Sequence, residues 1–157
     1  MKIIKRTLLT VLVLLVVLIV AALLFVRHLS HRSIPDYDQD LKLEGLHATV
    51  EVYRDSFAIP HVYAKDEHDL YMAVGYLLAE DRLWQMDMLR HVTEGRLSEI
   101  FGKDYVDTDL LLRALRFRKK SESILKQASP ENLEAIKAFT EGVNQFMQNN
   151  SRWLPPE

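Results

Sequence analysis

The sequence predicts an α+β fold preceded by a membrane-spanning helix, and three patterns support that prediction. An uncharged apolar run occupies residues 7–26. Apolar and polar residues then alternate over residues 48–54, which is typical of a strand with one covered face. From Asp66 onward, apolar residues recur at three- and four-residue steps, which is typical of amphipathic helices. Since one short hairpin makes only a marginal sheet, we expect the α+β fold to be incomplete in this chain.

The composition excludes several classes of function. The 157-residue chain has 20 Lys and Arg against 22 Asp and Glu. Residues 27–157 keep 17 of the 20 basic side chains and all 22 acidic ones, because Lys2, Lys5 and Arg6 precede them. This acidic balance argues against nucleic acid as a partner. The absence of cysteine excludes a disulfide framework, a thiolate zinc site and a cysteine nucleophile within these residues.

The first expected element is a membrane span. At about 1.5 Å per residue, the segment from Thr7 to Val26 reaches across the roughly 30 Å hydrocarbon core of a bilayer. A cleavable signal peptide is the alternative, but its apolar region is usually only about 7–15 residues long and ends in a small-residue cleavage site, which is missing before Arg27. We therefore assign residues 1–27 to an uncleaved signal anchor. Basic residues are more numerous before the span than after it, which favours export of the rest of the chain to the periplasmic or extracellular face.

A polar stalk is expected after the span. Residues 28–40 are rich in polar side chains, contain Pro35 and show neither a helical nor a strand period. Such a segment behaves as a linker rather than as a folded element. We assign residues 28–47 to this stalk and residues 48–157 to a folded domain.

The folded domain is expected to begin with a hairpin over residues 48–64. Alternation places three aliphatic side chains on one face of its first strand, residues 48–54. A second strand is predicted over residues 61–64. Residues 55–60 between the strands begin with aspartate and end with proline, two residue types that favour turns.

Helices are expected across residues 66–149. Their predicted extents are 66 to about 91, 96–101, 108 or 109 to about 128, and 129 to about 148. Asp66 and Ser129 suit N-caps, Pro130 suits the first helical position, and Gly102 suits a helix end. Apolar residues occupy more than one face of the first of these helices, so we expect it to be deeply buried.

Four charged residues lie inside this first helix: Glu80, Asp81, Arg82 and Asp87. An unpaired buried charge costs several kcal/mol by a rough estimate, so such residues are paired, solvated or functional. We interpret these four as members of ion pairs that fix the packing of the helix, and not as a catalytic acid and base.

Other chemical motifs in the chain are weak. Ser123 and Lys126 fit the S-x-x-K spacing of certain acyl transferases, but the companion motifs of those enzymes are absent. His61, His68 and His91 lack the H-E-x-x-H step that places two imidazoles on one helical face for zinc. We interpret these three histidines as surface or helix-terminal residues.

The Asp-Glu-His-Asp run at residues 66–69 offers carboxylates for a hard cation, yet it lacks the spacing and the glycine of a calcium loop. A cluster of charges at a helix start explains it better. Residues 149–151 match a glycosylation sequon, which matters only in a eukaryotic secretory host. The sequence has no glycine-rich phosphate loop and no G-x-S-x-G elbow. From these patterns alone we assign no catalytic, cofactor-binding or metal-binding residue.

A series of longer motifs gives the chain a family resemblance. Residues 52–64, VYRDSFAIPHVYA, resemble the R-D-x-x-G-x-P-H-I-x-A hairpin of the penicillin acylase (penicillin amidase) family. Residues 79–87, AEDRLWQMD, resemble its A-x-D-R-x-x-Q-M core. Further similar positions are Asp69-Leu70, Gly75-Tyr76, residues 95–99, Phe101-Gly102, Asp109, Arg113, residues 141–144 and residues 154–157. The resemblance covers roughly residues 50–157. It departs at Ala58, where the family usually has glycine; if that turn needs a positive φ, alanine costs about 1 kcal/mol there.

The resemblance implies an N-terminal-nucleophile hydrolase, in which an αββα sandwich is built on two antiparallel sheets. Members of this family are precursors that cut themselves into an α subunit and a larger β subunit. The β chain begins with the nucleophile, usually serine, whose own α-amino group serves as the base. Substrates in the family include β-lactams, N-acyl homoserine lactones and acyl peptides, and several members bind calcium.

Because the similar positions belong to the N-terminal portion of the α subunit, the resemblance implies that the nucleophile lies outside this chain. It implies as partner a β subunit from the same precursor, calcium only in the full-length enzyme, and no activity for the chain alone. The full-length enzyme is expected to cleave the acyl amide of a small N-acyl compound while residues 7–26 hold it in the membrane. The alternative is a non-enzymatic, membrane-tethered helical module that binds a protein partner.

Overall fold

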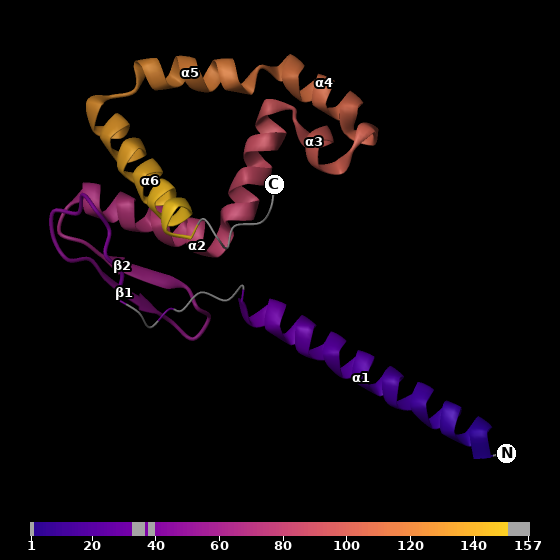
Figure 1. Cartoon of the computed structure of the whole chain (residues 1–157). Helices are drawn as coiled ribbons and strands as arrows, with labels where there is room; N and C mark the ends of the chain where they lie inside the picture. The colour runs from indigo at the N-terminus through magenta and orange to yellow at the C-terminus, as the bar shows by residue number, and fades with distance from the viewer. Residues whose placement is uncertain (1, 33–36, 38–39, 151–157) are drawn as a thin grey trace. The chain divides into compact units, whose positions relative to one another are not determined.

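The structure, a computed structural model, describes residues 2–32, 37 and 40–150 (Figure 1). The chain divides into two compact units, residues 1–40 and residues 41–157, which are described separately. Parts of three predicted features lie outside the described residues: stalk residues 33–36 and 38–39, Ser151 of the sequon, and the tail over 151–157.

The first unit contains the helix α1 (Lys2–Arg32). Its segment Arg6–His28 reaches a mean hydropathy of 3.4, with no part of that window buried. By length and composition α1 can cross a membrane, and an N-terminal signal sequence has the same properties. The helix continues past the predicted end of the span as far as Arg32, because no helix-breaking residue precedes Pro35.

The second unit begins with the predicted hairpin, formed by β1 (Glu51–Arg54) and β2 (Pro60–Tyr63) in antiparallel pairing. β1 is shorter than the predicted strand over residues 48–54. The reason is that the backbone N–H of Ala48 donates to the carboxylate of Asp69, at 2.9 Å, and not to a neighbouring strand. Among the described residues the sheet has these two strands and no third.

The hairpin turn holds a non-glycine residue in the left-handed region of backbone conformation. Ala58 has a φ of 61°, which is the positive φ that its departure from glycine suggested. Asp55 organises the turn, because its Oδ1 accepts the backbone N–H groups of Phe57 at 2.9 Å and Ile59 at 3.0 Å. The hydrogen bonds of Asp55 therefore offset a conformation that disfavours alanine.

Replacing Ala58 with glycine is expected to stabilise the second unit. Relief of the left-handed alanine contributes about 1–2 kcal/mol, and the greater freedom of glycine in the unfolded chain removes about 0.4–1 kcal/mol. We expect Ala58→Gly to raise the free energy of unfolding in urea by about 0.5–1 kcal/mol. The matched control is Ala128→Gly, at a residue with φ of −66°, which should give no gain. Equal effects of the two substitutions would contradict the prediction.

The longest helix of the second unit is α2 (Glu67–Glu94), which begins and ends with well-formed caps. The side chain of Asp66 accepts the backbone N–H of Asp69 at 2.9 Å, so the predicted N-cap is confirmed. Gly95 ends the helix with a φ of 65° and donates its N–H to the last turn.

A kink divides α2 into two halves, and it corrects the prediction that the whole helix is deeply buried. Arg82 leaves helical conformation, with φ of −144° and ψ of 25°, and the ribbon changes direction there (Figure 1). Before the kink, Met72 and Ala79 are completely buried. After it, Trp84 and Leu89 remain 44% and 63% exposed, because this half turns away from the helix that covers the first half.

The helix that covers α2 is α6 (Pro130–Asn149), and the two share the largest interface between elements of the unit. α6 begins as predicted, since the Ser129 side chain accepts the backbone N–H of Asn132 at 3.3 Å and proline follows at the first helical position. The core between the helices includes an edge-to-face contact of Tyr76 with Phe146, whose ring centroids lie 5.4 Å apart.

Two glycines let the backbones of α2 and α6 touch. A Cβ atom on Gly75 would lie 2.1 Å from the carbonyl oxygen of Phe139, and one on Gly142 would lie 2.0 Å from the carbonyl oxygen of Met72. Both positions are buried. Any larger side chain at either glycine must therefore push one helix away from the other.

The start of the second unit is also tied to α6. The side-chain amide of Gln145 donates to the carbonyl oxygen of Glu44 at 2.7 Å, and its oxygen accepts the Glu44 N–H at 2.9 Å. These residues are 101 positions apart in the sequence. The pair of hydrogen bonds joins the segment before the hairpin to the last described helix.

Between α2 and α6 the chain forms four shorter elements. They are α3 (Leu97–Phe101), a 3₁₀ turn η1 (Lys103–Tyr105), α4 (Val106–Leu115) and α5 (Phe117–Gln127). The predicted single helix to about residue 128 is wrong, because Arg116 takes a left-handed φ of 55° and separates α4 from α5. α4 packs on α2 and α3, whereas α5 crosses to the start of α6 and buries no residue (Figure 1).

The start of α3 is joined to α4 through a buried carboxylate. Asp109 is 3% exposed, and it accepts the backbone N–H groups of Leu97 at 2.8 Å and Ser98 at 2.9 Å. These are N–H groups of the first turn of α3, which has no capping side chain of its own. Asp109 therefore acts as a cap supplied from α4.

Candidate functional site

An ion-pair cluster joins the hairpin to α2 just before the kink. Arg54 contacts the carboxylates of Glu80 and Asp81, each with a nitrogen to oxygen distance of 2.9 Å. The side chains of Arg54 and Glu80 are 13% and 7% exposed. Arg54 also donates to the carbonyl oxygen of Ala58 in the hairpin turn, at 2.9 Å. For Glu80 and Asp81 the predicted ion pairs are therefore confirmed.

Burial governs the protonation of this cluster. It raises the pKa of Glu80, and the positive charge of Arg54 lowers it only in part. The guanidinium therefore stabilises the ionised form of this buried carboxylate. This arrangement suits a positioning role for the hairpin, because Arg54 joins it to two carboxylates of α2.

The other two charged residues of the helix differ in their partners. Asp87 pairs with Arg90 and with His91, whose Nδ1 lies 3.0 Å from Asp87 Oδ2. Arg82, at the kink, donates to the amide oxygen of Gln85 at 2.9 Å. The predicted ion pair is thus confirmed for Asp87, while the described contact of Arg82 is to a neutral side chain.

The weak motifs of the sequence do not converge on a common place. Ser123 lies in α5 and accepts a hydrogen bond from the Gln127 side chain at 3.5 Å. His61 is 54% exposed and lies 3.4 Å from the carboxylate of Asp55. These contacts join neighbours in the sequence, and they are those of surface residues.

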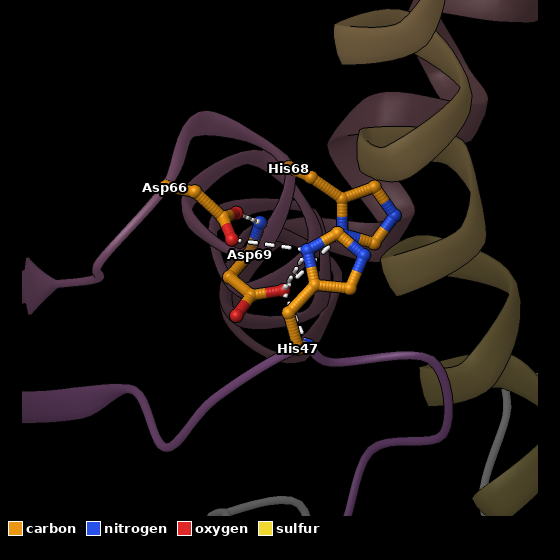
Figure 2. Close-up of side chains that lie close together, drawn as sticks. All are labelled: His47, Asp66, His68 and Asp69. Atoms are coloured by element: carbon orange, nitrogen blue, oxygen red, sulfur yellow. Dashed lines mark hydrogen bonds and ion pairs between the residues drawn. The ribbon is translucent and has the colours of Figure 1, made fainter.

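A second cluster forms where the segment before β1 lies beside the start of α2. It contains His47, Asp66, His68 and Asp69, and it is the one group within the described ranges whose three or more His, Asp or Glu side chains could hold a metal ion. One ligand atom from each residue lies within 4.8 Å of all the others. Figure 2 shows the two imidazoles stacked beside the carboxylates, with ring centroids 4.4 Å apart and an angle of 16° between the rings.

The shortest contacts of the cluster run between imidazole and carboxylate. His47 Nδ1 lies 3.0 Å from Asp66 Oδ2 and 3.9 Å from Asp69 Oδ1. His68 Nδ1 lies 3.2 Å from the same Asp69 oxygen. The Asp69 side chain is completely buried, whereas those of His47 and Asp66 are 61% and 41% exposed. The cluster is thus anchored on one buried carboxylate and open to solvent on its other side.

Backbone hydrogen bonds fix the charge of the two carboxylates. Burial alone would raise the pKa of Asp69, but N–H groups of His47 and Ala48 outweigh it, so the pKa lies below its usual value. The N–H of Asp69 and the ring of His47 lower the pKa of Asp66. The hydrogen bond to Asp66 in turn raises the pKa of His47. The carboxylates are therefore ionised at neutral pH.

Sequence reasoning singled out His68 and residues 66–69 but missed His47. The hairpin register explains the encounter, because β1 and β2 pair Glu51 with Tyr63 and Val52 with Val62. Continued outward, this register brings His47 opposite Glu67. The register of the hairpin could therefore have indicated that His47 lies near residues 66–69. A search for metal ligands by their spacing along the sequence does not use that register.

The donor set of this cluster does not fit calcium. Calcium takes six to eight oxygen ligands, roughly, at 2.3–2.6 Å. Here two of the four side chains offer imidazole nitrogen, a donor that suits zinc, copper, iron and nickel. The calcium expected in the full-length enzyme is therefore not assigned to these residues.

A solved structure with a similar fold indicates the class of this protein. Penicillin G acylase from Alcaligenes faecalis matches 68% of this chain and 58% of its own chain, with a TM-score of 0.60 and 32% sequence identity. The second unit is therefore a portion of the penicillin acylase fold, which was expected from the family resemblance. An αββα sandwich needs two sheets, whereas the described residues contain one two-stranded hairpin.

Comparison of sequences identifies the family. The Penicillin amidase family model matches residues 49–157, and the chain belongs to that family. The chain is 34% identical over 119 residues to penicillin acylase 2 proenzyme from Pseudomonas sp. strain SE83. It is 33% identical over 98 residues to penicillin G acylase from Escherichia coli, and 32% identical over 115 residues to acyl-homoserine lactone acylase QuiP from Pseudomonas fluorescens.

The matched region is a small part of these relatives. The alignments cover 76%, 62% and 73% of this chain, but only 15%, 12% and 14% of the three relatives. The relatives are amidohydrolases, and the chain is similar to them through residues that build the hairpin, α2 and the helices that follow.

Proposed function

We propose that this chain is the N-terminal segment of the α subunit of a membrane-anchored, exported acylase that hydrolyses the acyl amide of a small N-acyl compound. The single observation that carries the proposal is the Penicillin amidase match, which begins at the hairpin and runs through every later described helix. The relatives bear the names penicillin acylase and acyl-homoserine lactone acylase, so the proposed substrate is a β-lactam, an N-acyl homoserine lactone or a related acyl amide.

The apolar surface of the second unit supports a larger partner. Large apolar side chains are about half exposed or more on the hairpin and on helices far from it; among them are Phe57 at 82%, Tyr63 at 62%, Leu89 at 63%, Leu111 at 64% and Ile124 at 70%. Large contiguous apolar patches mark surfaces that other chains cover, and we propose that these side chains belong to such a surface. In the proposal that chain is the β subunit of the same precursor.

The outer edges of the hairpin support the same partner. Within the described part of the chain, β1 and β2 pair with each other and with no further strand. Two strands are marginal in water, whereas three or more strands or a covering layer give a stable sheet. We propose that strands of the β subunit extend this sheet, and that the Arg54 cluster holds the hairpin in place for them.

The chemistry is proposed to reside on the β subunit. There an N-terminal hydroxyl, that of serine in most members of the family, would attack the acyl carbonyl while the α-amino group accepts its proton. The residues of this chain would then position the hairpin and helices around the active site and take no direct part in the reaction. The ion pairs of Arg54 with Glu80 and Asp81 fit that role. Calcium belongs to the proposal only for the full-length enzyme.

Membrane attachment is proposed through α1. Its apolar segment Arg6–His28 supports an uncleaved anchor, with the second unit on the periplasmic or extracellular side. A cleaved signal sequence would have the same composition and would leave the enzyme soluble after export.

The proposal is tested by reading the source DNA past the codon for Glu157 and expressing the whole frame from its own start. We expect several hundred further codons, a glycine-serine-like junction, and hydrolysis of chromogenic N-acyl amides or N-acyl homoserine lactones by the membrane fraction. The matched control replaces the junction serine with alanine, which should abolish processing and hydrolysis. The same assay on residues 1–157 alone should give no activity.

Two outcomes would contradict parts of this proposal. Hydrolysis by the 157-residue chain alone would place the nucleophile within it and refute the assignment to a β subunit. Activity that is released from membranes by high salt, with a chain shortened at its N-terminus, would refute the anchor and leave the acylase assignment intact.

A further inference from the structure

We propose that His47, Asp66, His68 and Asp69 form a structural binding site for a divalent transition metal ion, with zinc as the best fit. The site is separate from the acylase chemistry, and it does not depend on the proposed function. It would fasten the segment before the hairpin to the start of α2.

The geometry supports four-coordinate binding. Zinc lies at about 2.0–2.2 Å from imidazole nitrogen and carboxylate oxygen in tetrahedral sites, so neighbouring ligand atoms lie about 3.3 Å apart. The shorter contacts of the cluster are 3.0, 3.2 and 3.9 Å. All four ligand atoms lie within 4.8 Å of one another, so closing to a tetrahedral set needs side-chain rotations, including rotation of one imidazole out of the stack, and no backbone movement is proposed.

The available lone pairs also suit a metal ion. Asp69 Oδ1 accepts the backbone N–H of His47, and a carboxylate oxygen has a second lone pair to offer. The Nδ1 atoms of His47 and His68 both approach this oxygen. Because the two rings are stacked at 16° and each Nδ1 lone pair lies in its ring plane, one ring must rotate about its side-chain bonds for both lone pairs to meet at one ion. A metal ion between them would bind both nitrogens in their neutral form.

The charge balance favours a dication. Two ionised carboxylates with two neutral imidazoles carry a formal charge of −2, which an ion of charge +2 neutralises. The positive end of α2 is already occupied, because Asp66 accepts the N–H of Asp69. His47 and Asp66 are exposed enough for the ion to enter from solvent. Four protein ligands leave no open position, so the expected role is structural and not catalytic.

The test uses the full chain, with any continuation of its reading frame, purified in detergent by a tag that contains no histidine. Zinc titration calorimetry is expected to give one ion per chain, and cobalt is expected to give the visible spectrum of a tetrahedral nitrogen and oxygen site. His47→Ala and His68→Ala should each weaken zinc binding by at least about 10-fold, since loss of even an outer-shell partner costs roughly 10–100-fold. Zinc should also raise the melting temperature of the parent protein.

The matched control is His61→Ala, which removes an exposed imidazole that also neighbours an aspartate. It should leave zinc affinity and the cobalt spectrum unchanged. The alanine variants keep the backbone N–H groups that Asp69 accepts, so circular dichroism should show them folded. Absence of zinc binding in the parent, undiminished binding in the His47 and His68 variants, or an equal loss in the His61 variant would each overturn the proposal.

Discussion

Gly142→Ala is expected to lower the free energy of unfolding by about 3 kcal/mol or more, and Gly75→Ala is expected to do the same. Alanine ordinarily stabilises a helix interior by about 1 kcal/mol relative to glycine. Here the new methyl group would lie 2.0 Å from the carbonyl oxygen of Met72, or 2.1 Å from that of Phe139. Overpacking against side chains typically costs about 1–3 kcal/mol, and a backbone oxygen has no rotamer through which to move away. Steric overlap should therefore reverse the sign of the helix preference.

Asn144→Ala is the matched control for these glycine variants. Asn144 lies on α6 two residues after Gly142, and its side chain is exposed. The same new residue at this position should be neutral or stabilise by about 0.5 kcal/mol. Thermal and urea unfolding followed by circular dichroism measure all three variants. If Gly142→Ala were as stable as Asn144→Ala, the close contact of α2 with α6 would not exist in solution.

Arg54→Met is expected to lower the free energy of unfolding by about 3 kcal/mol at neutral pH. Methionine replaces the apolar stem of the side chain but leaves the Glu80 carboxylate buried without its cation, and a broken buried pair typically costs about 3–5 kcal/mol. The matched control is Arg118→Met. Arg118 is 74% exposed and pairs with Glu122, and such surface pairs contribute only about 0–1 kcal/mol.

The effect of Arg54→Met should depend on pH in a defined direction. Burial raises the pKa of Glu80, and loss of the guanidinium should raise it further. A carboxyl group whose folded pKa exceeds its unfolded value favours the folded state most at low pH, and this contribution is lost as pH rises through the folded pKa. The deficit of the variant should therefore shrink on acidification. The double variant Arg54→Met with Glu80→Gln should recover part of the stability, and equal losses in the single and double variants would contradict this account.

Local features of the fold were predictable from the sequence because their causes are local. Asp66, Ser129 and Gly102 mark helix ends through their own side chain or their own backbone freedom, and the structure places a cap at each. The hairpin followed from alternation with turn residues. The motif that usually has glycine at position 58 raised a positive φ there only as a condition, and Ala58 meets that condition.

The features that the sequence did not predict depend on contacts across the fold. The kink at Arg82 and the break at Arg116 occur without glycine or proline, and each lies where the chain leaves one packing partner for another. The burial of α2 was predicted from its apolar residues alone, yet the half after the kink lacks the cover that α6 gives to the first half.

The candidate metal cluster shows the same division. His68 and the two aspartates could be selected from the sequence, because they are adjacent at a helix start. Their partner His47 precedes β1, and the pairing of β1 with β2 brings the segments at the open end of the hairpin together, where His47 Nδ1 lies 3.0 Å from Asp66 Oδ2. A search for metal ligands by their spacing along the sequence finds residues of one helix or strand. It misses residues that the fold brings close from another part of the chain.

The hydrogen bonds between Glu44 and Gln145 have a consequence for the order of folding. They join residues 101 positions apart, and the glycine contacts of α2 with α6 also bridge a long stretch of chain. The entropy of closing so long a loop must be overcome before these contacts form, which slows folding relative to helices that pack on near neighbours. As the chain emerges from the ribosome, the first half of α2 therefore lacks the cover of α6 until α6 has followed it. During that interval the apolar face of this half is exposed, which makes the incomplete chain prone to aggregation until α6 packs on it.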